Sequence, residues 1–108
     1  MENELRVYET SAGRAPFNDW LNALKDQVVR VRIKKRLDRL RLGNYGDFKA
    51  LGKGVLELRI QCWPGYRIYF AQVNPQIVLL LAGVDKNTQE KDILQAQAYW
   101  DEFNRRLN

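Results

Sequence analysis

Apolar and polar residues alternate along residues 54–71, which makes this stretch the clearest predicted element of the chain. Successive side chains of a strand point to opposite faces of the sheet, so the alternation predicts two strands. Pro64 and Gly65 separate the two halves, and we therefore predict a β-hairpin with one apolar face. The apolar face consists of Leu56, Leu58, Ile60, Cys62, Tyr66, Ile68 and Phe70.

The length of the turn decides which residues of the hairpin lie opposite one another. A two-residue turn would place Arg67 among aliphatic side chains, whereas a three-residue loop over residues 63–65 keeps one face apolar and the other polar. We predict the three-residue loop, in which Gly65 supplies the left-handed residue. In that register Arg59 lies opposite Tyr69 and diagonal to Arg67, with the two arginines roughly 7–8 Å apart.

The N-terminal part of the chain predicts a strand followed by two helices. Residues 5–10 alternate as a strand does, and Pro16 suits the first position of a helix. Apolar residues then recur at helical spacing to about residue 42, where Gly43 ends the helical pattern. We place the break between the two helices near residues 25–27, which gives a helical hairpin.

The rest of the chain completes an α+β pattern. Residues 44–52 are predicted to form a loop, and the apolar run over residues 77–82 predicts a central strand covered on both faces. A closing helix follows, with Asn87 as its predicted cap and Glu90 three residues on. We expect the N-terminal strand and helical hairpin to pack on an antiparallel sheet of about four strands, with the C-terminal helix covering only part of the other face.

Length and composition indicate one globular domain over residues 1–108. The chain of 108 residues is 45% hydrophobic and 29% charged, and no apolar run approaches the roughly 20 residues of a membrane span. The N-terminus has no signal-peptide pattern, so we expect a cytoplasmic protein. Histidine is absent and Cys62 is the single cysteine, which excludes a structural zinc site and an imidazole base. We expect no metal and no cofactor.

Positive charge is concentrated in the second predicted helix. The net charge is +5, and residues 28–41 carry seven basic residues against Asp38 alone. Such an element indicates a polyanion or an acidic partner, although an ordinary solvated helix face explains it equally well. The residues that we expect to contact RNA are Arg32, Lys35, Arg36 and Arg39 of this helix, Lys49 of the following loop, and Tyr69.

Arg59 and Arg67 are the strongest candidates for chemistry, because planar guanidinium groups match phosphate oxygens two bonds at a time. The alternative is a solvated sheet face on which Glu57 pairs with one of them, but one carboxylate does not neutralise two guanidinium groups. Lys53 and Lys86 flank the pair in the sequence. A lysine among arginines is pushed toward its neutral form, which makes each of these lysines a candidate base.

These residues resemble a known family of proteins. The chain is similar to the RelE/ParE toxin superfamily, and the nearest branch is the HigB-like "addiction module killer" group. The order of the predicted elements agrees as well, so the resemblance spans nearly the whole chain. The motifs that carry it are Leu56-Glu57-Leu58-Arg59-Ile60, Gly65-Tyr66-Arg67-Ile68-Tyr69-Phe70, Leu79-Leu80-Leu81-Ala82-Gly83 and Asp85-Lys86.

The resemblance implies a toxin of a type II toxin–antitoxin module, inhibited by a cognate antitoxin protein. RelE-like and HigB-like members cleave mRNA on the ribosome without a metal, whereas ParE-like members inhibit DNA gyrase. The histidines that some HigB-type toxins use have no counterpart here. The catalytic positions that the resemblance carries over are Lys53, Arg59, Arg67 and Lys86.

We therefore expect a ribosome-dependent mRNA endoribonuclease that inhibits translation. The RNA 2′-hydroxyl would attack the adjacent phosphate, Lys53 or Lys86 would act as the base, and Arg59 and Arg67 would stabilise the charged transition state. Two alternatives remain open: a DNA gyrase inhibitor on the same scaffold, and a non-catalytic nucleic-acid-binding protein.

Overall fold

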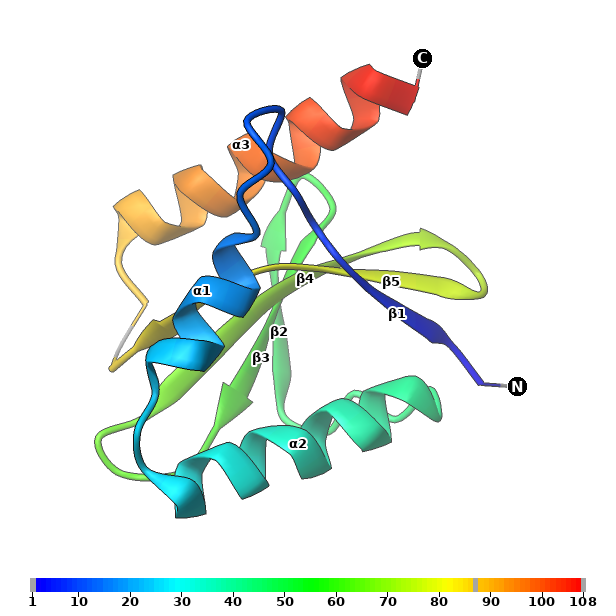
Figure 1. Cartoon of the computed structure of the whole chain (residues 1–108). Coiled ribbons are helices and arrows are strands. Elements are labelled where there is room, and N and C mark those ends of the chain that lie inside the picture. The colour runs from blue at the N-terminus through cyan, green and yellow to red at the C-terminus, as the bar shows by residue number, and fades with distance from the viewer. Residues whose placement is uncertain (1, 87, 108) are drawn as a thin grey trace.

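Five strands form one sheet in the order β1-β5-β4-β3-β2, and helices cover both of its faces (Figure 1). The computed structural model describes residues 2–86 and 88–107. The predicted α+β class is confirmed. The elements are β1 (Glu4–Val7), α1 (Pro16–Ala23), α2 (Gln27–Arg41), β2 (Phe48–Gly52), β3 (Val55–Ile60), β4 (Tyr66–Asn74), β5 (Ile77–Asp85) and α3 (Glu90–Leu107).

The sheet is mixed, so the expectation of about four antiparallel strands is wrong. β1 pairs with β5 in parallel, and β2 pairs with β3 within the region that we expected to be a loop. β2 lies at the edge of the sheet and is mostly exposed, and it has neither β-branched residues nor a clean alternation. Lys53 and Gly54 join β2 to β3 with φ values of 56° and 86°. Positive φ at both central residues is what a tight two-residue hairpin turn requires.

The β3–β4 hairpin has a longer connection than the three-residue loop that we predicted. Ile60 pairs with Tyr66, so residues 61–65 form the loop. The Cys62 N–H donates to the Ile60 carbonyl at 3.0 Å and the Gly65 N–H donates to the Cys62 carbonyl at 2.5 Å, so local turn bonds replace the ladder there. The register is shifted by two residues, and because a strand repeats every two residues, each side chain keeps its predicted face.

The helical hairpin follows the sequence pattern closely. α1 ends at Ala23 and α2 begins at Gln27, which confirms the predicted break. The Asp26 side chain caps α2 by accepting hydrogen bonds from the Val28 and Val29 amides. At the start of α3, the Asp92 carboxylate accepts from the Gln89 amide at 3.0 Å. The predicted cap, Asn87, lies outside the described residues.

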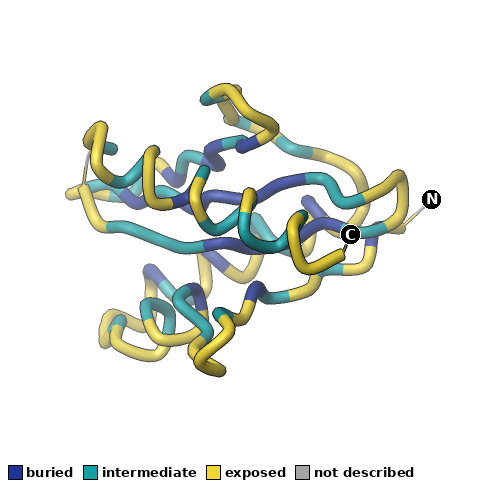
Figure 2. The backbone as a smooth tube through the Cα atoms, turned by 90° about the horizontal axis from the view of Figure 1, so that it is seen from above, coloured by how far each residue is buried: buried dark blue, intermediate teal, exposed yellow. Residues whose placement is uncertain are grey.

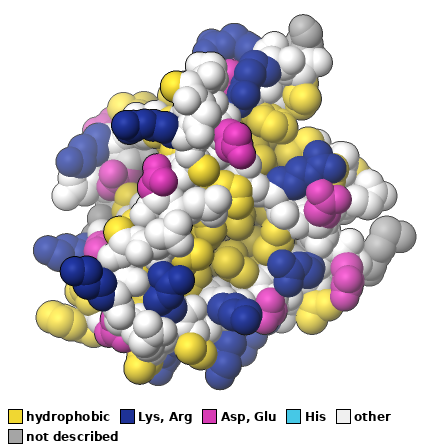
Figure 3. All heavy atoms as spheres, viewed as in Figure 1, with side chains coloured by type: hydrophobic (Ala, Val, Ile, Leu, Met, Phe, Trp, Pro, Cys, Tyr) yellow, Lys and Arg dark blue, Asp and Glu magenta, His cyan; other side chains and the backbone are white. Residues whose placement is uncertain are grey.

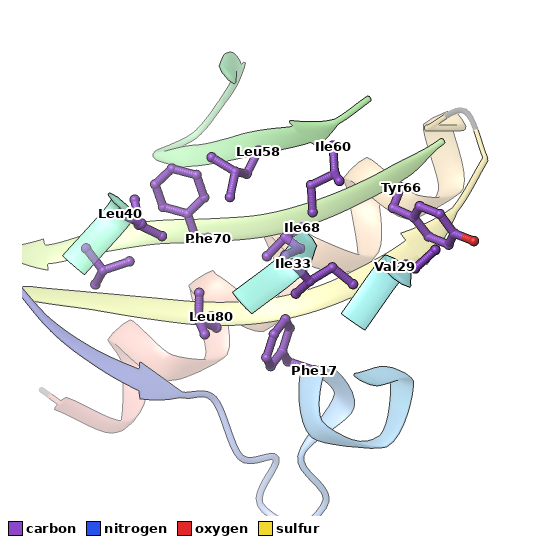
Figure 4. Close-up of a cluster of buried hydrophobic side chains, with 11 residues drawn as sticks. Phe17, Val29, Ile33, Leu40, Leu58, Ile60, Tyr66, Ile68, Phe70 and Leu80 are labelled. Atoms are coloured by element: carbon purple, nitrogen blue, oxygen red, sulfur yellow. The ribbon is translucent and has the colours of Figure 1, made fainter. Parts of the chain in front are cut away.

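Two layers of apolar side chains hold the helices to the sheet. α1 and α2 pack on one face, where Phe17, Val29, Ile33 and Leu40 contact the side chains of β3, β4 and β5 (Figure 4). α3 packs on the other face, with Ala96 at its centre. Burial is greatest in the central strands, and exposed residues alternate with less exposed ones along each helix (Figure 2). No helix within residues 2–86 and 88–107 is long and apolar enough to cross a membrane.

Candidate functional site

Arg59 of β3 and Arg67 of β4 lie directly opposite each other in the sheet. The Arg59 N–H donates to the Asp47 carbonyl at 3.0 Å, and its carbonyl accepts from the Arg36 guanidinium, so both of its backbone groups point away from β4. Arg59 and Arg67 are therefore a non-hydrogen-bonded pair, in which the Cα atoms are about 4.5 Å apart and the side chains are close. The predicted common face is confirmed, but the pair is directly opposite rather than diagonal.

Each arginine faces a carboxylate, which corrects the expectation that the pair is only half neutralised. Arg59 donates from Nε and Nη2 to Asp47 Oδ1 at 3.1 and 2.8 Å. Arg67 Nε lies 3.6 Å from Glu57 Oε1, which is beyond hydrogen-bond distance. The side chains of Arg59 and Arg67 are 36% and 18% exposed, so both remain in contact with solvent. The four side chains together carry no net charge.

Glu57 is held in place by two hydroxyl groups beneath the start of α3. The Tyr69 hydroxyl donates to Thr88 Oγ1 at 2.8 Å, and the Thr88 hydroxyl donates to Glu57 Oε2 at 2.5 Å. Tyr69 is only 1% exposed, and burial raises its pKa to about 12. The expected contact of Tyr69 with RNA is therefore wrong, because the ring is inside the protein.

The two candidate lysines lie at different ends of the sheet. The Lys86 amide donates to the Gly65 carbonyl at 2.6 Å, so Lys86 adjoins the loop between Arg59 and Arg67. Lys53 is in the β2–β3 turn, six residues before Arg59 along the chain. At about 3.3 Å per residue the Cα atoms of Lys53 and Arg59 are roughly 20 Å apart. Of the two lysines, the structure places only Lys86 near the arginine pair.

Lys49 joins the arginine face from the edge of the sheet. It pairs with Glu57 across β2 and β3 and is exposed. Directly opposite residues in a sheet share a face, so Lys49 lies beside the row that Asp47, Arg59 and Arg67 form. The edge strand β2 and the residue before it thus contribute one basic and one acidic side chain to this face.

A groove of about 690 Å³ runs between α2 and the end of the β3–β4 hairpin. Arg32, Lys35 and Arg39 line it together with Ile60 and Gln61. In Figure 3, Lys and Arg side chains are spread over the lower part of the molecule, where α2 lies. The predicted basic helix face is therefore an exposed wall of a groove.

Arg36 also lines this groove, but its guanidinium has a structural role. It donates to the carbonyls of Arg59, Tyr45 and Asp47, the last two at 3.0 and 3.1 Å. Burial lowers the pKa of this guanidinium. These bonds connect α2 to β3 and to the chain before β2, and the expected contact of Arg36 with RNA stays a prediction.

Comparison with known proteins finds a relative in Haemophilus influenzae. Over 81 residues the chain is 46% identical to an uncharacterized protein of Haemophilus influenzae, and the match covers 75% of this chain and 82% of the relative. The chain belongs to the family of this Haemophilus protein. No family model matches the chain.

For this family member, sequence reasoning missed two residues of the site, Asp47 and Thr88. Asp47 comes directly before β2, a strand that the sequence pattern does not predict. The spacing of residues along the chain therefore does not indicate that Asp47 approaches Arg59. Thr88 lies just before α3 and reaches Glu57 only because α3 crosses that face of the sheet.

Within residues 2–86 and 88–107, no three His, Cys, Asp or Glu side chains come together as a set of metal ligands.

Proposed function

We propose that this protein is a RelE/ParE-like toxin of a type II toxin–antitoxin module, and that it cleaves mRNA on the ribosome without a metal. The observation that carries the proposal is the direct pairing of Arg59 with Arg67 on a partly open sheet face. Two arginines on directly opposite positions of one sheet face offer several N–H donors for a phosphate group. The groove along α2 adds further positive charge for an RNA backbone.

Asp47 leaves part of the Arg59 guanidinium free to bind a phosphate group. The carboxylate occupies Nε and Nη2, and among the described residues Nη1 has no hydrogen-bond partner. Arg67 donates from Nη1 to the Tyr66 carbonyl at 3.0 Å, and its ion pair with Glu57 is long. A phosphate therefore binds at the solvent side of the pair without displacing either carboxylate.

In the proposed reaction the RNA 2′-hydroxyl attacks the adjacent phosphorus atom. The 2′-oxygen–phosphorus bond forms, the bond from phosphorus to the 5′-oxygen breaks, and a 2′,3′-cyclic phosphate results. Lys86 accepts the 2′-hydroxyl proton, and Arg59 and Arg67 stabilise the charge of the transition state. The proton for the departing 5′-oxygen comes from water or from a ribosomal group. A cognate antitoxin is the expected protein partner.

The carboxylate partners of the arginines favour a second candidate, a non-catalytic binder. Since Asp47 and Glu57 balance the two guanidinium groups, most of the uncompensated positive charge lies on α2. A protein that acts through α2 alone would bind nucleic acid or an acidic protein surface without cleaving RNA. A ParE-like gyrase inhibitor is one such protein.

Expression in growing bacteria tests the proposal. The wild-type protein is expected to arrest translation and cut transcripts, and Arg59→Ala and Arg67→Ala each to reduce cutting roughly 10²–10³-fold. Arg105→Ala is the matched control, because Arg105 is an exposed arginine of α3 that pairs with Asp101. Intact transcripts with a DNA-damage response would instead indicate gyrase inhibition. Normal growth with abundant, folded protein would support a non-catalytic binder.

A further inference from the structure

Among the residues that the structure describes, Trp63 is the most exposed large hydrophobic residue, at 92% exposure. It lies in the loop over residues 61–65, which joins β3 to β4. Trp20 packs against Gly83 of β5, and Trp100 packs against Gly54 of the β2–β3 turn. A tryptophan held entirely in water leaves a large apolar surface unburied, so its ring is available to a partner.

The loop that carries Trp63 adjoins the guanidinium of Arg67. Arg67 Nη1 lies 3.5 Å from the point where a Cβ on Gly65 would stand, and Gly65 is two residues after Trp63. The Lys86 amide donates to the Gly65 carbonyl at 2.6 Å. The loop that carries the exposed ring therefore adjoins Arg67 and Lys86 of the proposed site.

The same loop begins at the groove along α2. Gln61 lines that groove, and its Nε2 donates to Asp47 Oδ2 at 2.9 Å. Asp47 in turn holds Arg59. The Trp63 loop thus lies between the Arg59–Arg67 pair on the sheet and the basic groove along α2. An RNA strand that contacts both would pass this loop.

We propose that Trp63 stacks on a nucleobase of single-stranded RNA, next to the phosphate that Arg59 and Arg67 hold. This inference rests on the proposed function and adds a base-binding position to it. Proteins that bind single strands combine positive charge along the backbone with aromatic rings under the bases. Stacking needs no particular base, so the ring fits a substrate of varied sequence.

Cleavage of mRNA on programmed ribosomes tests the inference in a two-way cycle. One arm compares wild type with Trp63→Ala, and the other compares intact mRNA with mRNAs that lack the base at one nucleotide flanking the cut. Trp63→Ala is expected to lower kcat/KM about 5- to 150-fold on intact mRNA, the range that base stacking gives. On the mRNA that lacks the stacked base, the substitution is expected to have no further effect.

Two variants serve as controls. Trp63→Phe keeps a stacking ring and is expected to retain most of the activity. Leu107→Ala removes another exposed apolar side chain, 62% exposed at the end of α3, and is expected to leave cleavage unchanged. Since Trp63 is exposed, its replacement should not alter the unfolding midpoint, which a thermal melt checks.

The outcomes separate the inference from the proposed function. Cleavage by wild type with an unchanged rate for Trp63→Ala overturns the inference alone and assigns the exposed ring to contact with a protein. An equal loss on intact mRNA and on every base-deleted mRNA also overturns it. No cleavage by wild type overturns the proposed function and the inference together.

Discussion

The ring of Trp20 lies against the backbone of Gly83. Its Cε3 atom is 2.1 Å from the point where a Cβ on Gly83 would stand, so only glycine fits there. The Trp20 indole N–H donates to Asp85 Oδ1 at 2.9 Å. The tryptophan of α1 thereby positions the end of β5, and with it Lys86, the next residue after Asp85.

Gly83→Ala should destabilise the fold strongly. The added methyl group would overlap the indole ring, and overpacking of this kind costs about 1–3 kcal/mol in free energy of unfolding. Urea unfolding measures the change. Because Gly83 has no positive φ, the effect is steric rather than conformational. Adding Trp20→Leu to Gly83→Ala should cost less than the two single changes together, and additive costs would contradict this explanation.

The sequence predicted the faces of the β3–β4 hairpin but not its register. A strand's period of two assigns each side chain to a face, and any shift by two residues preserves that assignment. Arg59 and Arg67 therefore came out on one face in both registers. Their direct opposition depends on the loop over residues 61–65, where bonds between neighbouring backbone groups end the ladder early.

The sequence indicated Glu57 as a partner for one arginine but could not predict that Asp47 belongs to the site. Asp47 reaches Arg59 because β2 pairs with β3, and β2 has no pattern that distinguishes it from a loop. Burial of Tyr69 was also not predictable, because it depends on how far α3 extends over the sheet face. Contacts between distant segments decide both, whereas the helical character of α1 and α2 follows from local periodicity and β5 follows from its unbroken apolar run.

Asp47→Asn should reduce stability at neutral pH and leave it unchanged in strong acid. The hydrogen bond from Gln61, together with the bonds and charge of Arg59, lowers the pKa of Asp47 below its usual 3.8. A lowered pKa stabilises the folded state above pH 3.8, and this stability is lost as pH falls through the folded-state pKa. Because the pair is about one-third exposed, the expected loss at neutral pH is about 0.2–1 kcal/mol.

Urea midpoints measured from neutral pH down to about pH 2 check the Asp47 prediction. The difference between wild type and Asp47→Asn should shrink below pH 3.8, where the wild-type carboxylate becomes protonated. Asp101→Asn is the control, because Asp101 pairs with Arg105 at the surface of α3. A difference that stays constant with pH would show that the charge of Asp47 does not matter.

Between neutral and alkaline pH, Tyr69→Phe should lose less free energy of unfolding than wild type loses. Burial raises the pKa of Tyr69 from 10.0 to about 12. The folded state therefore keeps the phenol protonated, and the associated stability, present below pH 10, is lost as pH rises toward 12. The variant loses the hydrogen bond to Thr88, which costs about 0.5–1.5 kcal/mol at neutral pH.

Unfolding by urea at a series of pH values between 8 and 12 tests the Tyr69 prediction. Wild type should lose more stability than Tyr69→Phe above pH 10, because only wild type has this buried phenol to ionise. Tyr8, whose pKa burial also raises to about 12, remains in both proteins and keeps the comparison matched. Parallel stability curves would contradict the prediction.

Lys86→Met should abolish most mRNA cleavage, whereas Lys53→Met should preserve it. Lys86 adjoins the loop between the two arginines, and removing a catalytic base costs roughly 10²–10⁴-fold in rate. Lys53 is a close control, since both lysines are exposed and have positive φ, at 56° for Lys53 and 66° for Lys86. Both substitutions are therefore made in a similar backbone conformation.

Cleavage rates on programmed ribosomes measure the effect of each substitution. Wild-type cleavage should accelerate with rising pH, because the chain has no histidine. A bell-shaped profile centred near pH 6.5, or equal losses for both variants, would rule out Lys86 as the base.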